Sequence, residues 1–161
     1  MMKEIEMHTN ISGAGKKRTA ELDEAARFFA NQLMDPRMVR NLNIDIEVST
    51  GLDVMGECVD EDGWKNPRYF TISLNRNQTE DIIKTLAHEM VHVKQYAKNE
   101  LGKHLRMTSS TGLKIATVWQ GKVWKAKRKE DDYFDSPWEI EAYGREVGLY
   151  AKWVQYKKDL K

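Results

Sequence analysis

The residues best suited to chemistry in this sequence are two histidines and a glutamate in the run His88-Glu89-Met90-Val91-His92. On an α-helix, residues four apart differ by about 40° around the axis and about 6 Å along it, so both imidazoles reach one point in space. Glu89 lies about 100° round the helix from His88, beside that point. The spacing is therefore typical of a helix that holds a hydrolytic metal ion.

Imidazole and carboxylate ligands suit Zn²⁺, and a catalytic zinc has three protein ligands and an open position for water. We expect Zn²⁺ to be held by His88, His92 and a third residue, while Glu89 takes a proton from water and returns it to a leaving amine. The alternative is that the histidines are exposed or satisfied in the core and Glu89 is a surface charge. Burying all three without partners would be costly, which favours the metal site.

A later segment, Glu139-Ile140-Glu141-Ala142-Tyr143, bears on the third ligand. Together, residues 88–92 and 137–142 resemble the small zincin-type metallopeptidases of phage and bacterial genomes, which are grouped with SprT-like or minimal gluzincin domains. Gluzincins take their third ligand from a glutamate in the pattern E-x-x-A-D or E-x-x-S-D on a later helix. The resemblance implies that Glu139 is this ligand and that the protein is a zinc metallopeptidase acting on peptides or proteins.

Two other third ligands stay open. Glu141 is two residues from Glu139, hence about 200° away on a helix, so only one of them can face the metal. His104 follows the metal helix, and SprT-like proteases similarly take a third histidine from beyond that helix. Glu139 has a competing role, since it is also N3 of a capping box that begins at Ser136.

The resemblance leaves two supporting roles to be filled. Tyr143 stands where the family has an aspartate, so another carboxylate is expected to orient a ligand histidine, with Glu146 and Asp135 as candidates. The oxyanion of the reaction needs a donor, and the possible donors are Tyr133, Tyr143, Tyr150 and Arg145. The resemblance also implies that an extended substrate pairs with a sheet edge near the site.

The elements that must position these residues follow from hydrophobic periodicity. We expect a covering helix from Thr19 to the residues before Pro36, a metal helix capped by Asn77 or Thr79, and a C-terminal helix with Ser136 as N-cap. The expected strands are 42–48, an antiparallel pair 54–59 and 68–74, and a hairpin 113–119 and 122–127. Residues 60–67 and 103–112 are expected to be loops that carry specificity.

These elements predict an α+β fold: a single zincin-like domain with a small, mostly antiparallel sheet, a metal helix, and a C-terminal helix carrying the third ligand. Residues 1–18 show no sustained period and contain Ser12-Gly13-Ala14-Gly15, so we expect a mobile or loosely docked N-terminal segment before a domain at 19–161.

Composition narrows the protein class. The 161 residues include one cysteine, which excludes an internal disulfide and a cysteine-rich metal site. No apolar run exceeds three residues, so we expect neither a secretion signal nor a membrane span, and a cytoplasmic protein. With 26 Lys+Arg against 25 Asp+Glu, the net charge of +1 does not indicate a nucleic-acid partner.

One local basic run keeps a nucleic-acid role open. It is interleaved with Trp119 and Trp124 and consists of Lys122, Lys125, Lys127, Arg128 and Lys129. Such a run can bind phosphates and stack bases, although an exposed hairpin face neutralised by the acids at 130–132 is favoured. The alternatives to a general peptidase are therefore a DNA-associated SprT-like protease and a non-catalytic zinc protein.

Overall fold

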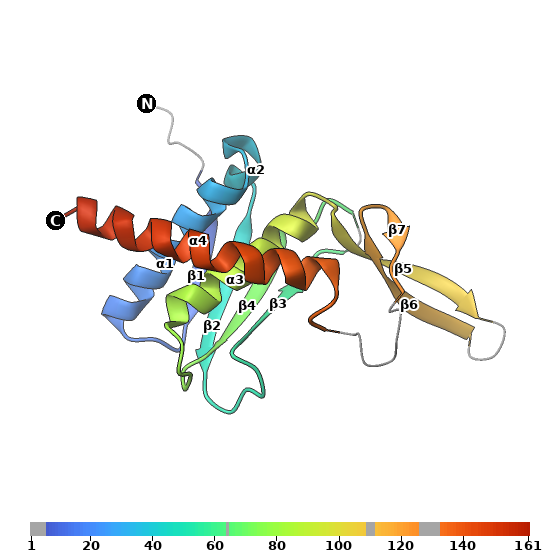
Figure 1. The fold of residues 1–161 in the computed structure, drawn as a ribbon, viewed down its shortest axis with the longest axis horizontal. Helices are drawn as coiled ribbons and strands as arrows, with labels where there is room; N and C mark the ends of the chain where they lie inside the picture. Colours follow the sequence, from blue (N-terminus) through green and yellow to red (C-terminus); the bar gives the residue numbers. More distant parts are fainter. Residues whose placement is uncertain (1–5, 64, 109–111, 126–132) are drawn as a thin grey trace.

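The computed structural model describes residues 6–63, 65–108, 112–125 and 133–161 (Figure 1). The helices are α1 (Lys16–Leu33), α2 (Pro36–Arg40), α3 (Ile82–Ala97) and α4 (Pro137–Asp159). The strands are β1 (His8–Ser12), β2 (Asn43–Ser49), β3 (Gly56–Asp60), β4 (Tyr69–Asn75), β5 (Leu101–Thr108), β6 (Gly112–Trp119) and β7 (Lys122–Val123). The expected α+β class is confirmed.

The larger sheet has four strands in the order β1-β2-β4-β3. β1 pairs parallel with β2 and β2 parallel with β4, whereas β3 pairs antiparallel with β4, as its sequence predicts. In the described residues of both sheets, two strand pairs are parallel and three are antiparallel. The parallel pairs were not expected, because the run that forms β1 has no strong strand pattern.

β1 changes the expected N-terminal boundary. Residues 8–12, which the sequence assigns to a loosely docked segment, pair with β2 over the full length of the strand, and His8 N donates to Leu42 O. α1 then begins at Lys16, three residues before the expected Thr19, with Gly15 as N-cap. The domain therefore starts well before residue 19.

Helix α3 lies at the centre of the molecule. It packs against the β3 and β4 side of the larger sheet, and α1 and α4 cover its other sides (Figure 1). Fourteen of its sixteen residues are buried, including polar ones. A polar group buried at such a place needs a partner or a ligand, so its polar residues indicate where function resides.

The second sheet, β5-β6-β7, was only partly expected. β6 occurs close to the expected 113–119, but its long partner is β5, which begins at Leu101 and overlaps the stretch 103–112 that the sequence predicts as a loop. β5 was missed because Gly102, Lys103, His104 and Arg106 interrupt its apolar residues. β7 has only two residues, and the remainder of the expected strand 122–127 extends into residues outside the described part of the chain.

No helix in the described parts of the chain is long and apolar enough to cross a membrane.

Candidate metal centre

Helix α3 begins at Ile82, capped by Asp81, whose carboxylate accepts a hydrogen bond from Ile83 N at 3.0 Å. The cap is therefore neither Asn77 nor Thr79, the two expected residues. Aspartate is as good an N-cap as asparagine, and it stands closer to the first buried apolar residue. From this start, His88 and His92 follow one turn apart, and both lie on the side of α3 that contacts Glu139 of α4.

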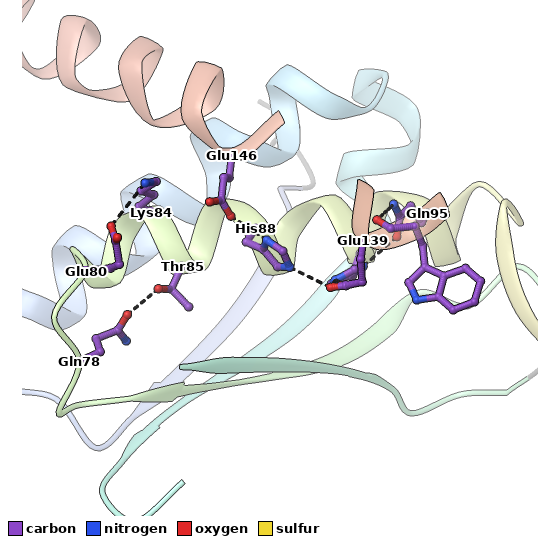
Figure 2. Close-up of polar contacts among 10 residues, drawn as sticks. Gln78, Glu80, Lys84, Thr85, His88, Gln95, Glu139 and Glu146 are labelled. Atoms are coloured by element: carbon purple, nitrogen blue, oxygen red, sulfur yellow. Dashed lines mark hydrogen bonds and ion pairs between the residues drawn. The ribbon is translucent and has the colours of Figure 1, made fainter. Parts of the chain in front are cut away.

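His88, His92 and Glu139 converge on one point, and Figure 2 shows His88 and Glu139 turned toward one another. Oε1 of Glu139 lies 3.1 Å from Nε2 of His88 and 3.2 Å from Nε2 of His92. All three residues are buried, and one ligand atom from each lies within 4.8 Å of the others. The three residues expected from the sequence therefore form a group that could hold a metal ion.

The outer nitrogens of the two imidazoles are also bonded. Nδ1 of His88 lies 2.7 Å from Oε2 of Glu146, and Nδ1 of His92 lies 2.8 Å from Oε1 of Gln95. The Gln95 amide is oriented by two further bonds, since its Nε2 donates to Trp138 O and to Glu141 Oε1, each at 2.9 Å. Its Oε1 must therefore accept, which places a proton on Nδ1 of His92.

These hydrogen bonds at Nδ1 indicate whether the three residues suit a cation. With Nδ1 of each ring protonated, a neutral imidazole presents the lone pair of Nε2 to the carboxylate of Glu139, which also only accepts. Three buried acceptors pointing at one another are unfavourable unless a proton or a metal ion lies among them. Two imidazole nitrogens oriented by outer partners and one carboxylate are a set that binds transition metals. The donor set therefore fits a metal ion.

Without a metal ion, the three residues shift one another's pKa values. Burial by itself would lower the pKa of His88 and of His92, but their hydrogen bonds to Glu139 and the charge of Glu89 raise both. Burial likewise opposes the charged form of Glu139, yet hydrogen bonds from both histidines lower its pKa to about 2. The group thus favours a carboxylate surrounded by positive charge.

The capping box expected at the start of α4 does not form. Ser136 is the N-cap and Pro137 the first helical residue, as expected, but the Ser136 hydroxyl donates to Tyr133 O at 2.6 Å and makes no cap bond. The carboxylate of Glu139 is therefore not occupied at the helix end. It turns toward α3 instead.

The two alternative third ligands lie elsewhere. Glu141 accepts hydrogen bonds from Lys94 Nζ at 2.8 Å, from Gln95 Nε2 and from Arg145 Nε. His104 lies on β5 and is exposed. Of the two carboxylates considered for orienting a histidine, Glu146 bonds His88, whereas Asp135 is exposed.

Glu89 stands beside this group in a confined position. Its side chain is almost fully buried, with 4% of the residue exposed, and no described residue hydrogen-bonds its carboxylate. Burial raises the pKa of Glu89 to about 7, against the opposing influence of His92 and His88. A carboxyl group with a pKa near neutrality can both take and give a proton at physiological pH.

Two cavities flank Glu89. One, of about 420 Å³, includes His88, Lys84 and Met55 in its lining; the other, of about 600 Å³, includes His92, Glu139 and Tyr96. The lining residues common to both are Asp53, Val54, Gly56, Glu89 and Tyr133. The cavities therefore lie on either side of Glu89 and give molecules from outside access to the group. A larger cavity of about 820 Å³, near Gly13 and the start of α3, contains none of these site residues.

The four possible oxyanion donors are reduced to two by their positions. Tyr150 donates to Asp81 Oδ2 at 2.6 Å, and Arg145 is paired with Glu141. Tyr143 packs its ring 4.5 Å from that of His88, and Tyr133 lines both cavities. Burial, the charge of Glu139 and hydrogen bonds to Tyr143 and Glu139 raise the pKa of Tyr133, so its hydroxyl keeps its proton at neutral pH.

Sequence reasoning did not identify Gly56, although a glycine inside a strand can mark a close approach of another group. A Cβ atom at this position would lie 2.7 Å from Cγ2 of Thr85 and 3.0 Å from Oε1 of Glu89. Gln95 was also given no role, since nothing in the sequence marks an amide as the partner of a histidine.

The basic run is only partly visible. Lys122 lies on β7 and Lys125 follows it, whereas Lys127, Arg128 and Lys129 fall within residues 126–132, outside the described residues. The nucleic-acid role expected from the run therefore stays a prediction.

Comparisons of the chain with protein-family models, with curated proteins and with solved structures gave no match.

Proposed function

We propose that the protein is a zinc-dependent peptidase in which His88, His92 and Glu139 hold Zn²⁺ and Glu89 is the general base. The observation that carries this proposal is the position of Glu89. This carboxylate is buried, lacks a hydrogen-bond partner among the described residues and lines both of the cavities that the three ligand residues between them also line. A structural metal site has no need of such a residue.

Zinc is the metal favoured by the donor set. Two imidazoles and one carboxylate are the ligands of a known class of catalytic zinc site, in which the fourth position stays open. No fourth protein ligand joins the group among the described residues. When bound, zinc would polarise a carbonyl group and make water more acidic.

The residues of the chain supply the proton transfers. Glu89 would take a proton from the attacking water and pass it to the nitrogen of the leaving amine. Glu146 and Gln95 hold the ligand imidazoles in one tautomer throughout. Tyr133, which lines the same cavity as Glu89 and whose hydroxyl keeps its proton, would donate to the oxyanion in exchange for its hydrogen bonds to Tyr143 and Glu139.

A polypeptide substrate is supported by the edge of the larger sheet. β3 is the last strand in the order β1-β2-β4-β3, and within the described residues its other edge has no strand partner. Gly56 and Cys58 of this strand line the larger of the two site cavities together with Glu89. An extended peptide can add to such an edge through backbone hydrogen bonds, which would carry its carbonyl groups past the ligand group.

The test is metal content and hydrolysis measured on the same preparation. We expect about one zinc per chain and cleavage of internally quenched peptides. Removal of zinc by a chelator should abolish cleavage, and one equivalent of zinc should restore it. Zinc bound at one equivalent without cleavage of any peptide in a diverse set would contradict the proposal and favour a non-catalytic metal site.

A further inference from the structure

The β5–β6 hairpin follows α3 in the chain and extends away from the body of the domain (Figure 1). It is attached at its base, where Leu101 is buried and Gln120 N donates to Glu100 O at 2.7 Å. Lys103 Nζ also lies 3.2 Å from Oδ1 of Asp60, the last residue of β3. The base of the hairpin is thus fixed next to the end of the free sheet edge.

One face of this hairpin exposes large apolar side chains. Leu113 is 65% exposed and Ile115 is 60% exposed, with Lys114 between them on the opposite face. Alternate residues of a strand lie on one face, so Thr117 continues the same row toward the base. We call Leu113, Ile115 and Thr117 the hairpin row.

The hairpin row leads into the larger of the two cavities beside Glu89, which we call the substrate cleft. Thr117 and Leu101 line the cavity of about 600 Å³ that also contains Glu89, His92 and Glu139. Gly56 and Cys58 of β3 line the same cavity. From Thr117, Ile115 and Leu113 lead outward over roughly 13 Å, the length of four strand residues. A chain leaving the cleft past the end of β3 therefore meets this row.

We propose that the hairpin row is an exosite that binds apolar side chains of an extended substrate polypeptide, several residues away from the bond that is cleaved. The inference rests on the proposed peptidase function and adds a substrate class to it: unfolded, apolar-rich chains rather than short peptides. Continuity with the cleft is what selects this occupant.

The size of the row argues against a folded partner. A stable interface between folded proteins buries roughly 800 Å² on each side, far more than the two exposed apolar side chains described on β6 supply. A chain already held in the cleft needs far less, because its second contact forms within the same complex and benefits from a high effective concentration.

The test compares a long and a short substrate. The variant is Leu113→Thr with Ile115→Thr, because threonine keeps the strand propensity while removing most of the apolar surface. The matched control is Lys114→Thr, on the opposite face of the same strand. The probes are reduced, carboxymethylated lactalbumin, which stays unfolded, and an internally quenched peptide of six residues, which reaches only about three residues to either side of the cleaved bond.

For the double variant we expect kcat/KM on the unfolded protein to fall about tenfold, chiefly through KM, as for the loss of a small apolar contact. Cleavage of the six-residue peptide should stay within about twofold, zinc content should not change, and Lys114→Thr should behave as the wild type. Equal losses on both substrates, or no loss on either, would overturn the exosite.

A binding measurement separates this inference from the peptidase proposal. Fluorescence anisotropy of labelled, carboxymethylated lactalbumin is recorded with Glu89→Gln protein, with and without the two threonine substitutions. We expect about tenfold weaker binding when the row is altered. If no substrate is cleaved but this difference is found, the peptidase proposal fails and the binding surface stands. Unchanged binding overturns the exosite whether or not cleavage occurs.

Discussion

Gly56 on β3 lies directly against Glu89 on α3, so close that a single methyl group on Gly56 would stand 3.0 Å from Oε1 of that carboxylate. The same added carbon atom would lie 2.7 Å from Cγ2 of Thr85. β3 can therefore lie this close to Glu89 because residue 56 has no side chain. This relationship makes the position of Glu89 testable without altering Glu89 itself.

We predict that Gly56→Ala displaces Glu89 and lowers kcat for peptide cleavage by about tenfold or more, because small misplacements of a catalytic group are costly. Zinc content should not change, since Gly56 does not contact the ligands. The matched control is Gly148→Ala on α4, where a Cβ meets nothing within 4 Å. Equal kcat in the two variants would show that the contact does not position Glu89.

The partner of His88 gives a second prediction. Glu146→Ala should weaken zinc binding by about 10- to 100-fold, because Nδ1 of His88 loses the acceptor that fixes its tautomer. Glu146→Gln should lose much less, since the amide oxygen can still accept that hydrogen bond. Competition with a chromophoric chelator measures both affinities. Similar zinc affinities in the alanine variant and the wild type would show that Glu146 does not support zinc binding.

The two neighbouring glutamates of α4 should behave differently. Glu139→Gln should lose most of the bound zinc, because the amide is a poor ligand in place of the carboxylate. Glu141→Gln should retain zinc but lower the free energy of unfolding by about 2 kcal/mol, since the buried ammonium of Lys94 keeps only Glu100 as a charged partner.

Metal analysis and denaturant unfolding on both variants check this pair. His104→Ala, on the exposed hairpin, serves as the control that should change neither property. Full zinc content in Glu139→Gln would exclude Glu139 as the third ligand.

A fourth prediction concerns pH. The pKa values of His88 and His92 are raised above 6.5 in the metal-free protein, so their stabilising contribution is present below pH 6.5 and is lost as the pH rises through the raised values. The pKa of Glu89, raised from 4.5 to about 7, acts in the same direction because the folded state favours its protonated form. The metal-free protein should therefore be less stable at pH 8 than at pH 5.

Zinc should reverse this trend, because it binds the deprotonated histidines. The increase in melting temperature on adding zinc should grow between pH 5 and pH 8, as measured by scanning fluorimetry at several pH values. An increase that is the same at every pH would contradict the ligand assignment.

Part of this arrangement could be predicted from the sequence because it is local. His88 and His92 lie on one side of a helix by virtue of their spacing alone, and the start of α4 follows from Ser136 and Pro137. That Glu139 rather than Glu141 meets the histidines needed the resemblance, since periodicity shows only that one of the two can. The structure supplies the partners that decide between them.

The rest depends on contacts between distant segments. β1 has a weak pattern of its own and becomes a strand because β2 offers it a parallel edge. β5 contains charged residues and a glycine, and it is specified by pairing with β6 rather than by propensity. Likewise, nothing near Gly56 in the sequence indicates that Glu89 lies against it.

The role of Glu89 as general base is tested by peptide cleavage with Glu89→Gln protein loaded with one equivalent of zinc. Glutamine keeps the shape of the side chain but cannot accept the proton, so we predict the same zinc content and melting temperature as the wild type and a loss of kcat of about a thousandfold. Zinc-loaded Glu89→Gln protein that cleaves peptides at the wild-type rate would show that Glu89 is not the catalytic base.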